Sequence, residues 1–194
     1  FGYYDHNMTV MFERVSDHIH NPDQYMPRQR LHYIRAAEVI ISTGSIERPL
    51  SFGNNDRPGI FLASAANEYM KVYGTLVGKK PIIFTNNDSA YKAAIEFHKN
   101  NIKSLIIDTR PSSDGELVKE AQSLGLVIKF NSGIADVKGR LKVTSAIVGK
   151  FNSDKESYAS LEEFECNCIC MSGGWTPTVH LSSQAGNKLK FDES

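Results

Sequence analysis

One stretch decides the fold: KPIIFTNNDSAYKAAIEFHKNNIKSLIIDTR, Lys80–Arg110. It opens with a short continuous apolar run, Pro81–Phe84, as expected for a strand that is covered on both faces. A helical segment follows at Asp88–Lys99, and Ser104–Asp108 has the composition of a second strand. Strand, helix and strand in this order predict a βαβ unit with parallel strands and a right-handed crossover.

The same alternation of elements continues downstream. Ser113–Glu116 has the form of a capping box, and the helix that it opens should end at Gly125. Leu126–Phe130 predicts a third parallel strand. Arg140–Lys150 alternates as an antiparallel ribbon would, and Phe164–Met171 predicts one more strand.

The residues before this block predict β-structure and one helix. Thr9–Val15 and Leu31–Ile41 are rich in β-branched and aromatic residues and flank a polar loop, which predicts a hairpin or meander. Val39–Ile41 is expected to be a buried strand that runs into the tight turn Thr43-Gly44. A helix that ends at Gly74 is predicted by apolar residues at helical spacing: Leu62, Ala66, Tyr69 and Tyr73.

The predicted fold class is α/β. We expect a Rossmann-like, three-layer inner domain (a parallel sheet plus an antiparallel ribbon) at residues 78–152. This domain would be inserted in an incomplete outer domain of the FAD/NAD-binding type, formed by residues 1–77 and 153–194. The chain opens at Phe1 rather than Met, and both ends are expected to be cut from a longer subunit.

Composition excludes several classes of function. Lys+Arg and Asp+Glu number 22 each, so the formal net charge is zero and no basic footprint for nucleic acid or a membrane surface is present. No apolar run approaches the roughly 20 residues of a membrane span, and no signal peptide is visible. With three cysteines and no secretory signal, the expected compartment is the reducing cytoplasm.

Cysteines and histidines suggest neither a metal site nor a catalytic pair. Cys166, Cys168 and Cys170 are spaced by two, so on one strand they should project to one face as buried free thiols. No metal-ligand spacing occurs among the histidines, and no nucleophile–base pairing can be argued from spacing. These six are His6, His18, His20, His32, His98 and His180.

The turn after Phe84 is the place where a dinucleotide fold binds pyrophosphate. Glycines there let the backbone approach the phosphates, and the helix N-terminus supplies N–H groups. This chain has Thr85-Asn86-Asn87-Asp88 instead, with Asp88 expected to cap the helix. Asp108 lies at the roughly 20-residue distance where an acid binds ribose hydroxyls in NAD-binding units. The inner domain therefore keeps the fold without a nucleotide, or it binds one differently through the Asn side chains.

Two other turns could approach a ligand. Thr43-Gly44 and Ser172-Gly173-Gly174 each follow a predicted strand, and small residues there allow close backbone approach. Both patterns also occur in ordinary strand ends. Trp175 could cover a ligand ring, or it could simply pack.

Several motifs resemble known flavoproteins. Ile83–Ala90 is similar to the second dinucleotide turn of thioredoxin-reductase-like flavoproteins, with Thr85, Asn86 and Asn87 in place of glycines. A more specific resemblance, covering essentially the whole chain, is to the α subunit of heterotetrameric sarcosine oxidase. Its motifs here are FGYYDHN (Phe1–Asn7), STGSIERPL (Ser42–Leu50), FGNNDRPG (Phe52–Gly59) and SGGWTPTVHL (Ser172–Leu181).

The resemblance implies an oxidoreductase that demethylates sarcosine to glycine, forming hydrogen peroxide and either formaldehyde or methylene-tetrahydrofolate. It implies NAD in the α subunit, FAD and FMN elsewhere in the complex, and other subunits plus tetrahydrofolate as partners. Thr43, Gly44, Gly173 and Gly174 would face the NAD.

The chain departs from the complete subunit at both ends. The glycine-rich NAD turn is expected upstream of Phe1 and the folate domain downstream of Ser194, so we expect no activity and weak or no NAD affinity from the chain alone. Two alternatives stay open: an α subunit of a related opine, proline or hydrogen-cyanide-forming dehydrogenase, and an interaction module that binds no nucleotide.

Overall fold

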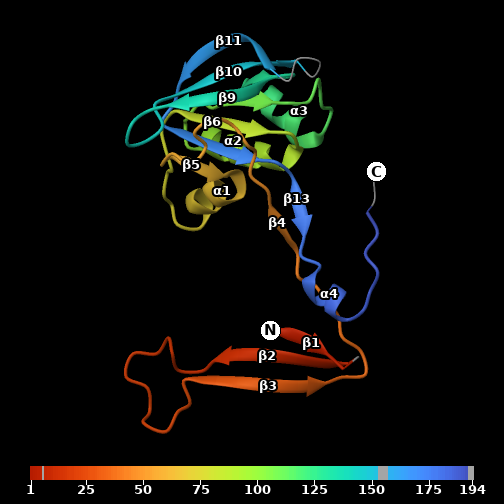
Figure 1. The fold of residues 1–194 in the computed structure, drawn as a ribbon. Coiled ribbons are helices and arrows are strands. Elements are labelled where there is room, and N and C mark those ends of the chain that lie inside the picture. The colour runs from red at the N-terminus through yellow and green to blue at the C-terminus, as the bar shows by residue number, and fades with distance from the viewer. Residues whose placement is uncertain (6, 153–156, 192–194) are drawn as a thin grey trace. The chain divides into compact units, whose positions relative to one another are not determined.

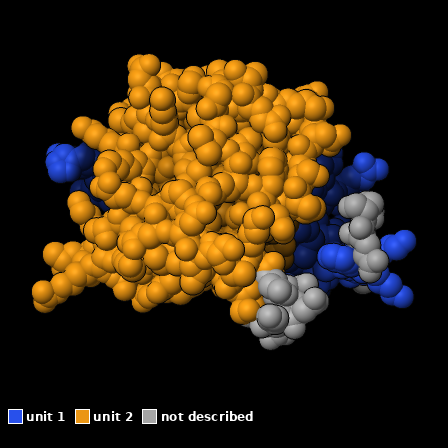
Figure 2. All heavy atoms as spheres, turned by 90° about the horizontal axis from the view of Figure 1, so that it is seen from above, with its two compact units in different colours: residues 1–46, 177–194 blue, residues 47–176 orange. Residues whose placement is uncertain are grey.

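The computed structural model describes residues 1–5, 7–152 and 157–191. The chain divides into two compact units, which Figure 2 colours separately: unit 1 is Phe1–Ile46 with Pro177–Ser194, and unit 2 is Glu47–Thr176. The expected inner segment 78–152 lies inside unit 2. This unit extends further in both directions because the strands at 60–62 and 168–172 belong to its sheet.

Unit 2 is built on a five-stranded parallel sheet (Figure 1). Every residue of its two central strands β12 and β6 is buried, because other layers cover both faces. The strands predicted within Lys80–Phe130 are therefore confirmed, and so is the α/β class. In spatial order the strands are β5 (Ile60–Leu62), β12 (Cys168–Ser172), β6 (Pro81–Thr85), β7 (Leu105–Asp108) and β8 (Val127–Lys129).

One face of this sheet packs against helices. Phe97 and Val118 lie in one apolar cluster with Ile83 and Ile106, side chains that the strands send to this face. Small residues let the helices approach closely: Ala66, Ala93, Ala94 and Ala121 are all buried in the same cluster. The elements of this layer are α1 (Ala63–Lys71), the 3₁₀ turn η1 (Asp88–Ala90), α2 (Tyr91–Lys99) and α3 (Glu116–Ser123).

The other face packs against a three-stranded antiparallel sheet, seen above the parallel sheet in Figure 1. Ile82, Phe84 and Ile107 meet Ile134 and Val148 in a second apolar cluster between the sheets. The predicted ribbon is thus confirmed as part of a third layer. Its strands are β9 (Gly133–Lys138), β10 (Ser145–Asn152) and β11 (Ser157–Glu165), in the order β11-β10-β9.

The start of α3 differs from the prediction. Gly115, not Ser113, is its N-cap, and no side chain caps the helix. Ser113 Oγ donates instead to Asp88 Oδ1, 3.0 Å away, so the capping box is wrong. The end of the helix is as expected, because Gly125 takes the left-handed conformation (φ 72°) that terminates helices.

The buried face of α1 also differs in part. Ala63, Ala66 and Met70 are buried, whereas Tyr69 and Tyr73 are exposed. The helix and its stop at Gly74 (φ 59°) agree with the prediction. The two tyrosines contact each other with ring centroids 5.9 Å apart, on the outside of the unit.

Phe164–Met171 is not one strand. β11 ends at Glu165 and β12 begins at Cys168, and the two belong to different sheets. Asn167 makes the break, since its Oδ1 accepts hydrogen bonds from the amides of Lys79 and Lys80. A polar side chain that captures two neighbouring amides ends one ladder and starts the next.

This break also separates the cysteines. All three are buried and free, as predicted. Cys168 and Cys170 lie in the helix-side cluster, whereas Cys166 lies between the sheets, so the expectation of one shared face is wrong for Cys166.

Unit 1 contains an antiparallel meander of β1 (Gly2–Tyr4), β2 (Met8–Arg14) and β3 (Gln29–Arg35), which confirms the predicted hairpin. Its short helix α4 (His180–Gln184) supplies Gln184, whose Oε1 accepts from the Tyr3 amide. The chain enters unit 2 through β4 (Ser45–Glu47) and leaves it through β13 (Trp175–Pro177), which pair as a two-stranded sheet.

Val39–Ile41 is not a strand. These residues are irregular, and the side chain of Ile40 is 94% exposed. An apolar run becomes a buried strand only when neighbouring strands pair with it and cover it, and within the described residues this run pairs with no strand and is only partly covered at Val39 and Ile41. Across the same residues, no helix is long and apolar enough to span a membrane.

Burial predicts that the cysteines are unreactive. Burial raises the pKa of the Cys166 thiol to about 12, while its contact with Cys168 and burial raise the pKa of Cys170 well above its usual range. A raised thiol pKa means less thiolate at neutral pH, and the thiolate is the reactive form. At a pH near the ordinary thiol pKa of about 8.5, the thiols of the folded chain should therefore hardly react with a disulfide reagent. In the urea-unfolded chain, all three thiols should react. Rapid stoichiometric labelling of the folded chain would contradict this arrangement.

Candidate functional site

The turn after β6 has the position of a phosphate cradle, but three of its amides already donate to protein acceptors. The Asn86 amide donates to the Ser172 carbonyl at 3.4 Å, and the Asn87 amide donates to Thr85 Oγ1 at 3.0 Å. The Ser89 amide donates to Asn87 Oδ1, also at 3.0 Å. A phosphate held by a helix N-terminus needs free N–H groups, and these three have protein acceptors.

Asn87 ties the turn to the neighbouring strand. Its side-chain oxygen caps η1, and its Nδ2 donates to the carbonyl and to the hydroxyl of Ser172 at 3.2 and 3.0 Å. One amide side chain thus satisfies both the start of the helical segment and the end of β12. The cap is Asn87, so the prediction that Asp88 caps the helix is corrected.

Asp108, the candidate ribose ligand, is buried and fully engaged. It is 0% exposed and accepts hydrogen bonds from the Tyr91 hydroxyl at 2.8 Å and from the Arg110 amide at 3.0 Å. The Arg110 guanidinium adds bonds from Nε at 3.0 Å and from Nη2 at 2.7 Å. With its oxygens occupied in this way, Asp108 has no capacity left for ribose hydroxyls.

Asp88 joins the same cluster from the turn. Its Oδ1 lies 2.7 Å from Arg110 Nη2, so one guanidinium bridges two carboxylates. A Cβ on Gly115 would lie 1.7 Å from Asp88 Oδ2, so a side chain at that position would displace the Asp88 carboxylate. The carboxylate therefore fills space at the start of α3, where the helix dipole stabilises a negative charge.

Electrostatics make this cluster a fixed structural unit. Burial, then the hydrogen bond to Asp108, raise the pKa of Tyr91 far above its ordinary value. The hydrogen bonds to Asp108 and Asp88 raise the pKa of Arg110 despite its partial burial. The phenol stays neutral and the guanidinium stays charged across the accessible pH range. The residues of this turn consequently do not fit a dinucleotide pyrophosphate.

Gly173 and Gly174 are in unit 2, directly after β12. A Cβ on Gly173 would lie 2.8 Å from the Pro49 carbonyl and 3.1 Å from that of Arg48. The Gly173 amide donates to the Arg48 carbonyl, and Gly174 has a φ of 93°. Close packing of two chain segments therefore accounts for Gly173, and left-handed geometry accounts for Gly174.

Thr43 and Gly44 are in unit 1. Thr43 Oγ1 donates to the Thr178 carbonyl, and the Gly44 carbonyl accepts from the Thr178 amide. Gly44 has a φ of 66°, and a Cβ there would meet nothing within 4 Å. Unlike Gly173, Gly44 has open space beside it.

Trp175 lines a small cavity of about 190 Å³ at the carboxyl end of β12. Its Nε1 donates to Ser89 Oγ at 2.9 Å, and the buried Glu47 carboxylate opposite accepts from the Ser64 amide. The volume is below the roughly 300–1,000 Å³ of small-molecule sites, so a nucleotide does not fit there.

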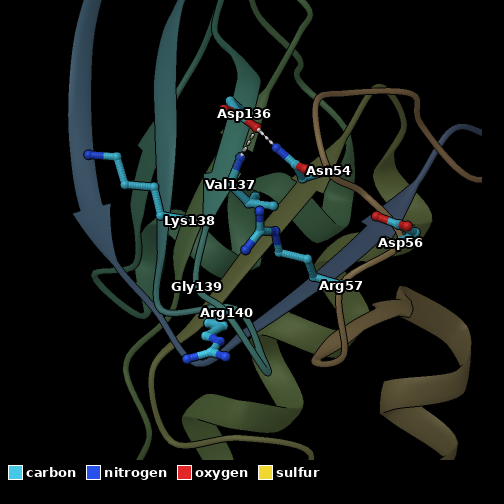
Figure 3. Close-up of a pocket in the computed structure, with 8 residues that line it drawn as sticks. All are labelled: Asn54, Asp56, Arg57, Asp136, Val137, Lys138, Gly139 and Arg140. Carbon is cyan, nitrogen blue, oxygen red and sulfur yellow. Dashed lines mark hydrogen bonds between the residues drawn. The ribbon is translucent and has the colours of Figure 1, made fainter.

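A larger cavity of about 790 Å³ lies elsewhere in unit 2, between the loop that precedes β5 and the end of β9 (Figure 3). Sequence reasoning assigned no role to its residues, although Arg57 was visible in the FGNNDRPG motif. The lining residues are Asn54, Asp56, Arg57, Asp136, Val137, Lys138, Gly139 and Arg140. Across the described residues no cluster of three metal-ligating side chains occurs; His6 lies outside them.

The chain is similar in sequence to known proteins. No family model matches it. It is 34% identical over its whole length to the sarcosine oxidase subunit alpha of Corynebacterium sp. (strain P-1), of which it covers 20%. The chain is homologous to part of sarcosine oxidase alpha subunits. The protein of that name from Rhizobium meliloti (strain 1021) is also 34% identical, over 97% of the chain and 18% of its own length. The chain thus spans about a fifth of these relatives.

Solved structures share the fold. The thioredoxin reductase of T. acidophilum superposes with a TM-score of 0.63 at 17% identity, over 84% of this chain and 53% of that one. The L-proline dehydrogenase of P. horikoshii gives a TM-score of 0.53 at 23% identity, over 84% of this chain and 26% of that one. At these identities the likeness shows the fold and nothing more.

The buried cluster can be tested by removing one carboxylate. Asp108→Ala should lower the free energy of unfolding by roughly 3 kcal/mol, because the Tyr91 hydroxyl and the Arg110 guanidinium lose their buried acceptor. Asp114→Ala is the matched control: this exposed aspartate should change stability by less than about 0.5 kcal/mol. Urea denaturation of both variants measures the difference, and equal stabilities would refute the role assigned to Asp108.

Proposed function

We propose that this chain is a segment of the α subunit of a sarcosine oxidase complex, an oxidoreductase acting on a CH–NH group. The proposal rests chiefly on the 34% identity that extends over the whole chain. In the complex, sarcosine would lose its N-methyl group by oxidation, with molecular oxygen as the oxidant. The products would be glycine, hydrogen peroxide and either formaldehyde or methylene-tetrahydrofolate.

Within that complex, we assign this chain a supporting role. The intact α subunit would carry NAD, and FAD and FMN would belong to the complete complex. Thr43 and Gly44 from one turn, and Gly173 and Gly174 from another, are the proposed contributors to NAD binding. The open space beside Gly44 supports its part, while Gly173 would contribute through backbone groups because its Cα already packs against Pro49.

The inner turn takes no part in nucleotide binding in this proposal. Three of its amides donate hydrogen bonds to Ser172, Thr85 and Asn87. The carboxylate of Asp108 accepts hydrogen bonds from Tyr91 and Arg110. We therefore propose that residues 78–152 serve as a retained scaffold, inserted between the outer-domain segments 1–77 and 153–194. Partners would be the other subunits of a heterotetrameric oxidase, together with tetrahydrofolate bound outside this chain, in the cytoplasm.

The chain alone should bind NAD weakly or not at all and should oxidise no sarcosine. Isothermal titration of the 194-residue chain with NAD should show no micromolar binding, since the turn after β6 is closed to a pyrophosphate. The complete complex serves as the positive control for both binding and peroxide formation. Micromolar NAD binding to the isolated chain would overturn the supporting role assigned to it. If the complex oxidised proline or an opine in place of sarcosine, the alternative dehydrogenase assignment would be correct.

Gly44 offers a sharper test in the complete subunit. Gly44→Ala should lower the amount of bound NAD, because the new methyl group would enter the space proposed for the ligand. Gly74→Ala is the matched control, since Gly74 also has a positive φ (59° against 66°) and nothing within 4 Å of its Cβ position. Both variants should be destabilised by about 1 kcal/mol from backbone strain. Equal NAD contents in the two variants would remove Gly44 from the site.

A further inference from the structure

The 790 Å³ cavity of unit 2 has no role in the function proposed above, and three cationic and two anionic side chains line it. One side is the loop that carries Asn54 and Arg57, and the other is β9 with the turn that follows it. Figure 3 shows the Arg57 side chain extended across the cavity toward Val137. Arg140 reaches the same cavity from the β9–β10 turn.

Backbone contacts hold in place the two segments that carry Arg57 and Arg140. Gly53 forms a bridge to Asp136 on β9, and the Arg57 amide donates to the Asn54 carbonyl, so the loop is anchored beside the sheet. On the other side, Gly139 has a φ of 128°, and a Cβ there would lie 1.9 Å from the Lys142 carbonyl. Only glycine allows this tight turn, which carries Arg140 next to the end of β9.

The anionic side chains of the cavity do not neutralise these arginines. Asp136 Oδ1 accepts from Asn54 Nδ2 at 2.7 Å and from the Val137 amide at 2.8 Å. Asp56 leaves the loop in a different direction from the Arg57 guanidinium, as Figure 3 shows. In the described part of the chain, neither Arg57 nor Arg140 has a carboxylate within the 4.0 Å of an ion pair, whereas Lys138 is paired with Glu163 at 2.6 Å.

Arg57 carries a second, independent sign of a missing partner. Its Nε atom is buried and has no hydrogen-bond acceptor among the described residues. A buried donor on a charged group costs free energy unless an acceptor is supplied. Nε itself is out of reach of a ligand, but the outer end of the same guanidinium extends into the cavity (Figure 3), where an anion can compensate its positive charge.

We propose that this cavity is a binding site for an oxyanion of the phosphate class, held by Arg57 and Arg140. Planar guanidinium groups bind the oxygens of phosphate through paired, charge-assisted hydrogen bonds. The site is shallow and wide open to solvent, so it can admit a bare phosphate or the phosphoryl group of a larger molecule. Val137 is the one apolar side chain that lines it, so recognition rests on charge rather than on stacking. The oxyanion can be free phosphate or the phosphoryl group of a small metabolite.

Titration of the 194-residue chain at low ionic strength tests the site with three probes: inorganic phosphate, pyrophosphate and AMP. We expect saturable binding that weakens as salt is added. Arg57→Gln and Arg140→Gln should each weaken pyrophosphate binding by about tenfold or more. Tighter binding of AMP than of phosphate would identify a phosphorylated metabolite as the ligand, and equal binding would identify the free anion.

Arg14→Gln is the matched control, because it removes one exposed guanidinium from β2 in unit 1 and leaves the cavity intact. It should bind each probe as the parent chain does. Circular dichroism and urea denaturation check folding, and Arg140→Gln, on an exposed turn, carries the test if Arg57→Gln does not fold. Absence of saturable binding to the parent chain would overturn the proposal, and so would equal weakening by Arg14→Gln and the two cavity variants.

Discussion

A single guanidinium, that of Arg110, holds together the part of the molecule where a dinucleotide fold normally binds its ligand. It lies 2.7 Å from both Asp88 and Asp108, which come from the turn after β6 and from the end of β7. Without this cation, two carboxylates would face and repel each other beside the core. The start of α3, the position of Gly115 and the environment of Tyr91 all depend on the cluster that Arg110 completes.

The cluster explains how a nucleotide fold can persist without its nucleotide. In a binding turn, glycines leave amides free and an acid free, and the ligand completes the hydrogen bonds. Here side chains of the protein complete them: Asn87 serves the helical segment and Ser172, while Arg110 and Tyr91 serve Asp108. The fold is kept because the apolar clusters on both faces of the parallel sheet contain none of the turn residues Thr85–Asp88, although Tyr91 belongs both to the helix-side cluster and to the cluster around Asp108. This independence of core and site is what allows one scaffold to serve different purposes.

Sequence reasoning recognised that the cradle was filled, because glycine is the only residue that leaves such a turn open and none is present. The details were harder to predict. Asp88 and Asn87 are both good capping residues, and only the geometry of η1 decides that Asn87 caps while Asp88 turns toward Arg110. Likewise, Asp108 has the spacing of a ribose ligand, and its burial follows from a tyrosine 17 residues earlier that no spacing rule selects. Ser113 has the pattern of a cap, but its hydroxyl is drawn to the same cluster.

The sequence by itself determined the βαβαβ core of unit 2 with its parallel strands, the presence of an antiparallel ribbon and the resemblance to sarcosine oxidase alpha subunits. These features depend on local periodicity and on short motifs, which can be recognised along the chain without knowing how it packs. Tertiary structure alone decided that Gly173 is explained by the Pro49 backbone while Gly44 borders open space, that Cys166 faces away from Cys168 and Cys170, and that Arg57 and Arg140 line one cavity. Each of these facts depends on residues far apart in the chain, and their proximity is set by how the layers pack rather than by any pattern along the sequence.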